Sequence, residues 1–456
     1  MHRLLVFAAA AAFVFGAEKQ TALDRYIAAA DSSYKYELVQ TTPGQGFTTY
    51  VLDMTSQTWR TPAEVNHTGW RHWVTIIKPH QIKHSTGFLF ITGGANNSAK
   101  PPANAPANLT SIAVDTGTVV TELRMVPNQP VIFAGETKGR TEDSLIAYSW
   151  DKFLRGGDDN WPARLPMTKS AVRAMDSVTS FLASEQGGKG KVDKFVVSGA
   201  SKRGWTAWET AAADKRVVGV IPIVIDLLNV EKSFDHHWRA YGFWAPAIQD
   251  YIDARTMDWM GSPQFKALMK IEDPYEYRDR LSMPKYIVNA TGDQFFLPDS
   301  SQFYFDDLKG EKYLRYVPNS EHSMRGTDAF ENVQAYYESF LNGSERPKIT
   351  WKFEKDGSIH VKASGTPSAV KLWQASNPKA RDFRVDSIGR TWKDTNLEPS
   401  RKGEWIAKMV APEAGWTGYF VELTYASNGK TPLKFTTAVR VTPDTLPFPA
   451  YQPKKP

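Results

Sequence analysis

The chain has 456 residues, 41% of them hydrophobic, and contains no cysteine. Disulfide frameworks and cysteine-ligated metals are therefore excluded, and a chain of this length can bury large cores without cross-links. The formal net charge of +6 comes without a cluster of lysine and arginine, so nucleic acid is not an expected partner.

The chain opens like a secretory signal peptide. A short basic start precedes an apolar, alanine-rich run over residues 4–15, and small residues follow before Glu18. This pattern predicts a signal peptide over residues 1–17. The run is too short to span a membrane, and no later apolar run is long enough, so we expect a secreted or periplasmic protein without a membrane span.

Five Asn-x-Ser/Thr sequons occur, and those at Asn96 and Asn289 lie in segments that we assign below to the candidate site. Glycans there would block the site. Together with the lack of cysteine, this favours a bacterial protein over a eukaryotic glycoprotein.

Residues 18–343 alternate between strand-like and helix-like patterns, which predicts an α/β unit. The amphipathic pattern of residues 168–186 predicts a helix that packs on a sheet. The expected strands are 70–77, 86–91, 129–133, 194–198, 216–225, 283–289 and 312–317.

The segment Gly199-Ala200-Ser201-Lys202-Arg203-Gly204 lies between a predicted strand and a predicted helix. A serine among small residues in such a turn is typical of a nucleophile elbow. Ser201 is therefore the candidate nucleophile.

An acid and a base follow in the chain order of α/β-hydrolases. Asp293 comes just after one predicted strand, and His322 lies in the loop after the next. A serine hydroxyl needs an imidazole to take its proton and a carboxylate to orient that imidazole. Asp299 is a rival for the acid, but its surroundings favour a helix N-cap, so we prefer Asp293.

Two features beside Ser201 suggest further roles. The backbone N–H of Lys202 and one from Gly94 or Ala95, after an early strand, are the expected oxyanion donors. The basic side chain of Arg203 or Lys202 could face the cleft and favour an acidic or polar acyl group; solvent exposure or a structural ion pair with the helix is the alternative.

An aromatic-rich insertion over residues 229–282 precedes the strand that leads to Asp293, where α/β-hydrolases commonly hold a lid. We name Trp238 and Trp244 as candidate substrate-binding residues, with a small core of the insertion itself as the alternative. The adjacent His236 and His237 lack the i, i+4 spacing of a zinc pair, so no metal is expected.

Short alternating strands over residues 344–442 predict an immunoglobulin-like or fibronectin-like β-sandwich, and residues 443–456 form a proline-rich tail.

These segments together resemble the PhoPQ-activated pathogenicity-related proteins over nearly the whole mature chain. The motifs that carry the resemblance are residues 91–96, 197–205, 289–299 and 318–322. The resemblance implies an exported α/β-hydrolase-like protein; the family is linked to virulence and resistance to antimicrobial peptides, and similar proteins of social amoebae are secreted proliferation repressors. A Ser-Arg pair similar to the one here occurs in glucuronoyl esterases, although in this chain Lys202 follows the serine directly.

The expected function is a serine hydrolase acting on a small molecule or a peptide without a cofactor. Ester hydrolysis is preferred because the insertion is rich in aromatic residues and shows no motif for holding a peptide terminus. A serine peptidase and an exported interaction protein on a hydrolase scaffold stay open as alternatives. The sequence gives no prediction of the substrate or of the oligomeric state.

Overall fold

The computed structural model describes residues 20–427 and 429–454. The predicted signal peptide, residues 1–17, lies outside the described residues. Within them, no helix is both long enough and apolar enough to cross a membrane.

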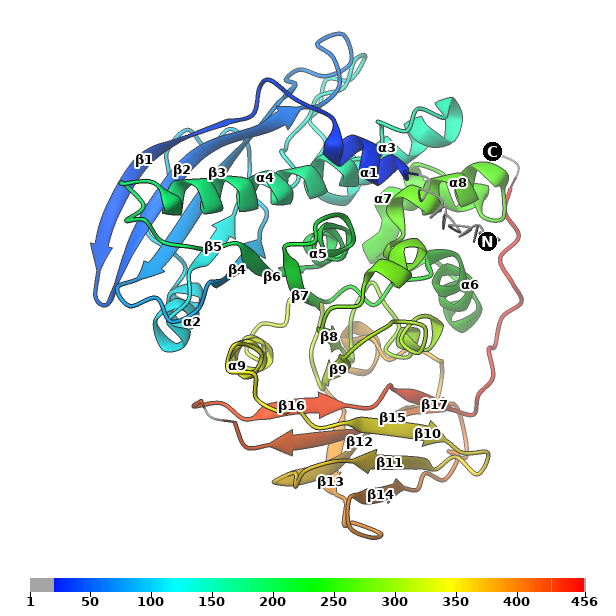
Figure 1. The fold of residues 1–456 in the computed structure, drawn as a ribbon. Coiled ribbons are helices and arrows are strands. Elements are labelled where there is room, and N and C mark those ends of the chain that lie inside the picture. Colours follow the sequence, from blue (N-terminus) through cyan, green and yellow to red (C-terminus); the bar gives the residue numbers. More distant parts are fainter. Residues whose placement is uncertain (1–19, 428, 455–456) are drawn as a thin grey trace, which may run out of the picture.

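One large sheet runs through the molecule, in the order β1-β2-β3-β5-β4-β6-β7-β8-β9-β16-β15-β12-β13, with β17 beside β15 (Figure 1). Its strands from β5 to β9 are parallel, and the first three are antiparallel. The strands of the first two thirds of the chain are β1 (Lys35–Gly44), β2 (Phe47–Thr58), β3 (Gly69–Pro79), β4 (Thr86–Ile91), β5 (Val120–Leu123), β6 (Lys194–Ala200), β7 (Val217–Ile223), β8 (Lys285–Ala290) and β9 (Lys312–Val317).

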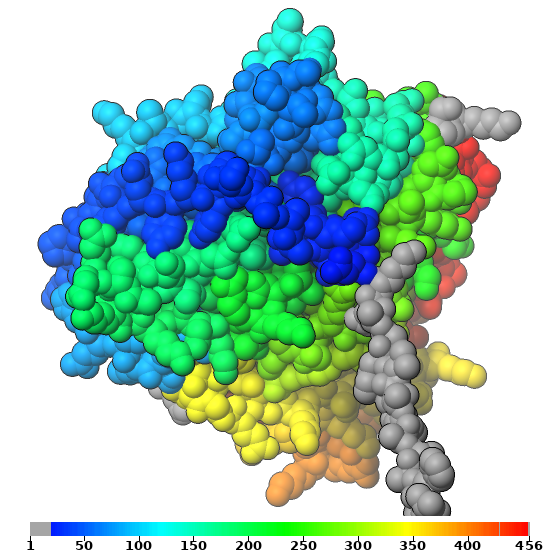
Figure 2. All heavy atoms as spheres, turned by 45° about the horizontal axis from the view of Figure 1, so that its top comes forward, coloured from blue at the N-terminus to red at the C-terminus, as the bar shows by residue number. Residues whose placement is uncertain are grey.

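Helices cover both faces of the parallel strands. α4 and α5 lie on one face, α2 and α9 on the other, and a separate apolar core fills each side (Figure 1). The blue N-terminal segment lies beside the green helix α4 on the surface (Figure 2). The helices are α1 (Ala22–Ala28), α2 (Ala107–Thr116), α3 (Glu142–Gly156), α4 (Arg164–Ala183), α5 (Lys202–Ala213), α6 (Val230–Tyr241), α7 (Gln249–Asp253), α8 (Pro263–Glu272), α9 (Ala329–Leu341) and α10 (Val385–Ile388).

The register of the parallel strands brings four loops to one edge of the sheet. Ile91 of β4 pairs with Gly199 of β6, and Ala290 of β8 pairs with Val317 of β9. Parallel strands end at the same edge, so the segments that follow β4, β6, β8 and β9 gather there. This is the edge at which open α/β sheets bind ligands.

The C-terminal part is the predicted β-sandwich. One of its sheets holds the last strands of the large sheet, and the other has the order β10-β11-β14. The sequence did not predict that β16 would pair with β9 and so join the sandwich to the central sheet. The strands are β10 (Ile349–Phe353), β11 (Ile359–Ala363), β12 (Ala369–Asn377), β13 (Lys393–Asn396), β14 (Glu404–Ala407), β15 (Trp416–Tyr425), β16 (Leu433–Thr436) and β17 (Arg440–Thr442).

The strand predicted at residues 129–133 is wrong. This segment makes only isolated bridges, and the strand beside β4 is β5 instead. The reason is local: Pro127 and Pro130 have no backbone N–H to contribute to a sheet ladder.

Candidate active site

Ser201 lies in a strained turn between β6 and α5. Its φ of 56° and ψ of −127° are in a region that a residue with a Cβ rarely adopts. The turn is possible because Gly199 and Gly204 meet across it: a Cβ on Gly204 would lie 2.8 Å from the Gly199 carbonyl oxygen. Strain of this kind at a turn that exposes a hydroxyl is what a nucleophile elbow requires.

Asp293 and His322 form a hydrogen-bonded pair at the ends of β8 and β9. His322 Nδ1 lies 2.8 Å from Asp293 Oδ2 and 3.0 Å from Oδ1. Asp293 is 3% exposed, and its Oδ1 also accepts from the N–H of Phe295. The carboxylate is thus fixed in place, and it fixes the orientation of the imidazole.

The rival acid, Asp299, has a different partner. Its carboxylate accepts from His236 Nε2 at 3.0 Å and from Arg381 Nη2 at 2.6 Å. Burial would raise the pKa of Asp299, but the charges of Arg381 and His236 hold that pKa well below its ordinary value. Asp299 therefore belongs to a buried ion-pair cluster between α6 and the β-sandwich and is not the partner of His322.

Ser201 lines one small pocket of about 30 Å³, and the acid–base pair connects to this pocket through Phe295. Phe295 lines this pocket with Ser201, and the ring of Phe295 lies 4.3 Å from the imidazole of His322. The walls are mostly apolar and aromatic, with Asp143, Arg164 and Lys202 as the charged members. The lining consists of Asp143, Trp150, Arg164, Ser201, Lys202, Trp205, Ile225, Leu227, Phe234, Ile248, Tyr251, Phe295 and Phe296.

The expected oxyanion donors lie at the start of α5 and on the loop that follows β4. The N–H of Lys202 is the first of α5, where no acceptor within the helix is available. A Cβ on Gly93 would lie 2.5 Å from Arg203 Nη2, so the loop after β4 contacts the first turn of α5. Gly94 follows at a φ of 136°, and the roles of Gly94 and Ala95 as donors stay predictions.

The two basic residues after Ser201 are engaged in ion pairs. Arg203 donates twice to the carboxylate of Glu142, at 2.7 Å each, and Lys202 Nζ lies 3.0 Å from Glu142 and 3.1 Å from Asp143. Burial would raise the pKa of Glu142, but the hydrogen bond and charge of Arg203 lower it to about 2. The structure therefore shows the ion-pair alternative for both side chains, and substrate binding by Arg203 stays a prediction.

The insertion contributes aromatic residues to the pocket, but Trp238 and Trp244 are not among its lining residues. Their rings contact Tyr451 of the C-terminal tail, at 4.8 and 5.1 Å between centroids. The red tail passes along α6 at the edge of the molecule (Figure 1). Phe234 and Tyr251 are the insertion aromatics that line the pocket.

Sequence reasoning missed one buried carboxyl near the site. Asp226, just after β7, accepts from the hydroxyls of Tyr304 and Tyr316 at 2.6 Å each. Burial raises the pKa of Asp226 to about 8 despite these hydrogen bonds. An acidic residue directly after an unbroken apolar strand was the signal that could have identified it.

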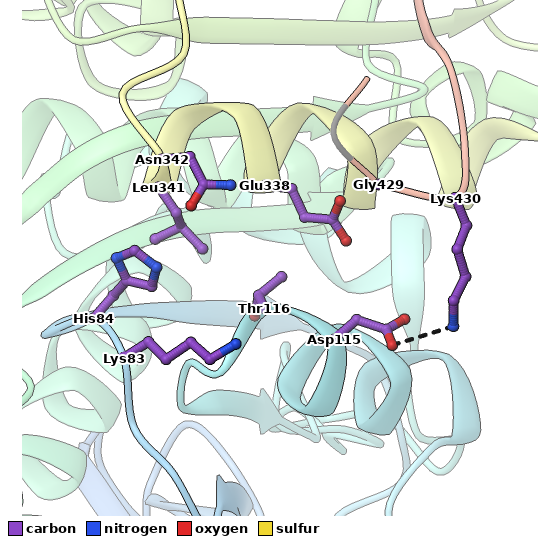
Figure 3. A pocket seen from close by; sticks show the side chains of 9 residues that line it. All are labelled: Lys83, His84, Asp115, Thr116, Glu338, Leu341, Asn342, Gly429 and Lys430. Carbon is purple, nitrogen blue, oxygen red and sulfur yellow. Dashed lines mark hydrogen bonds and ion pairs between the residues drawn. The ribbon is translucent and has the colours of Figure 1, made fainter. Parts of the chain in front are cut away.

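The described residues contain no group of three or more histidine, aspartate and glutamate side chains arranged to hold a metal ion. Of the adjacent histidines, His236 bonds Asp299 and His237 accepts from the N–H of Ala245. A wider pocket of about 450 Å³ lies on the other face, between α2, α9 and the segment before β16 (Figure 3). It includes the Lys430–Asp115 ion pair and is remote from Ser201 in the fold.

A strained serine turn after β6, an acid after β8 and a histidine after β9 are the arrangement of an α/β-hydrolase, which confirms the predicted fold class. Among solved structures, the chain is similar to acetyl xylan esterase 1 from Thermoanaerobacterium sp. JW/SL YS485, with 19% identity, a TM-score of 0.47, and 70% of this chain and 91% of that chain covered. It is also similar to a glucuronoyl esterase from Solibacter usitatus, with 14% identity, a TM-score of 0.41, and 71% and 91% covered.

The sequence comparisons extend over most of the chain. It is 36% identical over 464 residues to autocrine proliferation repressor protein A of Dictyostelium discoideum, covering 94% of this chain and 92% of the relative. The family model of the PhoPQ-activated pathogenicity-related proteins matches residues 23–384, which include Ser201, Asp293 and His322. The chain therefore belongs to the PhoPQ-activated pathogenicity-related protein family.

Proposed function

We propose that this protein is a serine hydrolase that cleaves carboxylic esters with short acyl groups. The observation that carries the proposal is the Asp293–His322 pair, which lies against the same pocket wall as the elbow of Ser201. A nucleophile, a base and an orienting acid in this order supply all the groups that acyl transfer through a serine needs.

The mechanism follows from these groups. His322, with its Nδ1–H directed to Asp293, takes the proton of Ser201 as the hydroxyl oxygen attacks the ester carbonyl. The N–H of Lys202 and a donor from Gly94 or Ala95 stabilise the oxyanion. The C–O bond of the leaving group then breaks, His322 returns the proton to the alcohol, and water releases the acid from Ser201 by the same steps.

The size and lining of the pocket support a short acyl group. The pocket is small, with a volume of about 30 Å³, and apolar and aromatic side chains form most of the wall. An acetyl-sized group would therefore require the least rearrangement of the wall, whereas each further methylene would have to displace more packed side chains.

The charges beside Ser201 favour an esterase over a peptidase. An exopeptidase holds the substrate's amino terminus with carboxylates, and the carboxylate that lines the pocket, Asp143, is already paired with Lys202, while its neighbour Glu142 is paired with Lys202 and Arg203. Binding a further ammonium group would require breaking these ion pairs.

Labelling with a fluorophosphonate, followed by intact-mass measurement, tests the nucleophile. We expect one adduct on the wild type and none on Ser201→Ala. A panel of p-nitrophenyl esters from acetate to octanoate, sugar esters and dipeptide amides then tests the reaction class. Cleavage that depends on Ser201 but is confined to the amides would make the protein a peptidase.

A second function, that of an exported interaction protein, is favoured by the relative at 36% identity, whose name describes an autocrine proliferation repressor. Export rests on the N-terminal pattern of residues 1–17, and a link to virulence rests on the family alone. Sequencing the N-terminus of secreted protein tests the cleavage site. The absence of any Ser201-dependent turnover would favour the interaction role.

A further inference from the structure

A loop of the β-sandwich leaves its own domain and contacts the two loops that carry Asp293 and His322. This loop, residues 378–392, connects β12 to β13 and includes α10; we call it the bridging loop. The sandwich does not need it for attachment, because β16 already pairs with β9 and the buried Arg315 of β9 forms an ion pair with Glu422 of β15. The contacts of the bridging loop therefore call for a separate explanation.

A chain of backbone hydrogen bonds connects the three loops. Val385 N–H donates to the carbonyl of Gly292 at 3.0 Å, and Gly292 N–H donates to the carbonyl of Ser320 at 2.9 Å. Gly292 directly precedes Asp293, and Ser320 lies two residues before His322. A Cβ on Gly292 would lie 2.5 Å from Val385 Cγ2, so the approach of the bridging loop itself requires glycine at this position.

Asn319 lies in the loop after β9 that carries His322, and its side chain makes two hydrogen bonds to the bridging loop. Its Nδ2 donates to the carbonyl of Trp392, and its Oδ1 accepts from the N–H of the same residue, both at 2.9 Å. Asn319 has a φ of 55°, which asparagine tolerates better than most residues. Arg390 Nη1 also donates to the Asn319 carbonyl at 2.9 Å.

The side chain of Gln294 links the loop that carries Asp293 to the loop of His322 and to the bridging loop. Its Oε1 accepts from the backbone N–H of His322 at 3.1 Å, and its Nε2 lies 3.4 Å from Asp386 of the bridging loop. Arg381, at the start of the bridging loop and 3% exposed, extends the connection to α6 through Asp299 and His236.

We propose that the bridging loop is part of the catalytic apparatus: it holds the loops of Asp293 and His322 in register, with Asn319 as the main positioning residue. The inference rests on the proposed hydrolase function. Catalytic groups must be held to within about 0.5 Å, and a misplacement of about 1 Å can cost about 100-fold in rate. Loops at strand ends lack that rigidity by themselves, and the hydrogen bonds of the bridging loop supply it.

The substitution Asn319→Gly tests the proposal, because glycine accepts the positive φ and removes the two side-chain hydrogen bonds to Trp392. We expect kcat on p-nitrophenyl acetate to fall about 10- to 100-fold with KM within about twofold, and phosphonate labelling of Ser201 to slow in parallel. Asn319→Asp keeps the acceptor for Trp392 N–H and should recover part of the loss. Val361→Ala, in the buried core of the distant sheet β10-β11-β14, is the control: it destabilises the sandwich and should leave kcat unchanged.

A double-mutant cycle separates positioning from general stability. In an Asp293→Asn background the imidazole already lacks its orienting carboxylate, so the position of the two loops matters less and Asn319→Gly should cost less than about threefold there. An equal cost in both backgrounds, wild-type kcat in Asn319→Gly, or an equal loss in Val361→Ala would each overturn the proposal.

A readout without turnover keeps the two proposals distinguishable. The His322 Nδ1 proton, hydrogen-bonded to Asp293, should give a low-field proton resonance that disappears in His322→Gln. We expect it to broaden or shift in Asn319→Gly and to stay in Val361→Ala. If the wild type neither turns over esters nor labels, the hydrolase function fails, and an unchanged resonance in Asn319→Gly would still refute the positioning role on its own.

Discussion

Arg203 and Glu142 form a two-pronged ion pair directly behind the nucleophile turn, with both hydrogen bonds at 2.7 Å. The Nε of Arg203 also donates to the carbonyl of Val126, close to the loop after β4. Through Glu142, Arg203 connects the first turn of α5 to α3. Through Val126, it connects this turn to the segment beside the Gly93–Gly94 turn. The charges of the Arg203–Glu142 pair stabilise this corner of the site.

Glu142→Gln should destabilise the protein in a pH-dependent manner. The Glu142 side chain is 40% exposed and Arg203 12%, so we expect a loss of about 1–2 kcal/mol at pH 7, below the cost of breaking a fully buried pair. The pKa of Glu142 is lowered from 4.5 to about 2 in the folded protein. The stabilisation is therefore complete above pH 4.5 and is lost as the pH falls toward 2.

Urea unfolding of wild type and Glu142→Gln between pH 7 and pH 3 measures this effect, and the difference should shrink as the pH falls. Glu185→Gln is the matched control, because Glu185 pairs with Lys189 at the surface and should change stability by less than about 0.5 kcal/mol. A difference that stays constant down to pH 3 would contradict the assignment.

Asp293→Asn and Asp299→Asn should fail in different ways. Asparagine at 293 leaves the imidazole without its orienting carboxylate, and we expect kcat to fall by about 10³- to 10⁴-fold with little change in stability. Asparagine at 299 leaves the buried Arg381 without its anionic partner, which should cost about 3–5 kcal/mol. Measuring kcat well below the melting temperature, together with urea unfolding, separates the two. Equal losses of kcat would contradict the choice of Asp293 as the acid.

Asp226→Asn should make the protein more resistant to alkaline pH. Burial raises the pKa of Asp226 from 3.8 to about 8, so the folded protein keeps a proton that the unfolded chain releases. Wild-type stability therefore falls as the pH rises between these values, and asparagine, which mimics the protonated carboxyl, removes this contribution. Unfolding curves from pH 5 to pH 9 should show that the free energy of unfolding of the variant increases relative to that of the wild type as the pH rises. Parallel curves would show that Asp226 does not titrate in this range.

Phe234→Ala should broaden the acyl specificity. Phe234 reaches the pocket from α6 and is 4% exposed, so its removal opens space beside Ser201. A methylene that enters this space gains about 0.8 kcal/mol, or about fourfold in kcat/KM. We expect the ratio of butyrate to acetate hydrolysis to rise by about tenfold. Phe243→Ala, at an exposed aromatic of the same insertion, should leave the ratio unchanged. An unaltered ratio in Phe234→Ala would remove Phe234 from the acyl pocket.

The order of strands, turns and helices along the chain was sufficient to predict the fold class and the candidate triad. An apolar run such as residues 217–223 favours a buried strand, and a serine between Gly199 and Gly204 favours a tight turn, because both properties depend on near neighbours in sequence. The chain order of Ser201, Asp293 and His322 then follows from strands that end at one edge. The choice of Asp293 over Asp299 also rested on local turn signals, and the geometry of His322 agrees with it.

The tertiary structure alone decided which partners meet across the sequence. Glu142 reaches Arg203 and Lys202 from 61 and 60 residues away, and Arg381 reaches Asp299 from 82, so no local pattern could reveal that these charges are paired. The same holds for Tyr451, which covers Trp238 and Trp244, and for the bridging loop beside Asn319. Periodicity and turn chemistry are set by residues a few positions apart, whereas ion pairs, aromatic contacts and loop clamps depend on how distant segments pack, and that is fixed only when the whole chain folds.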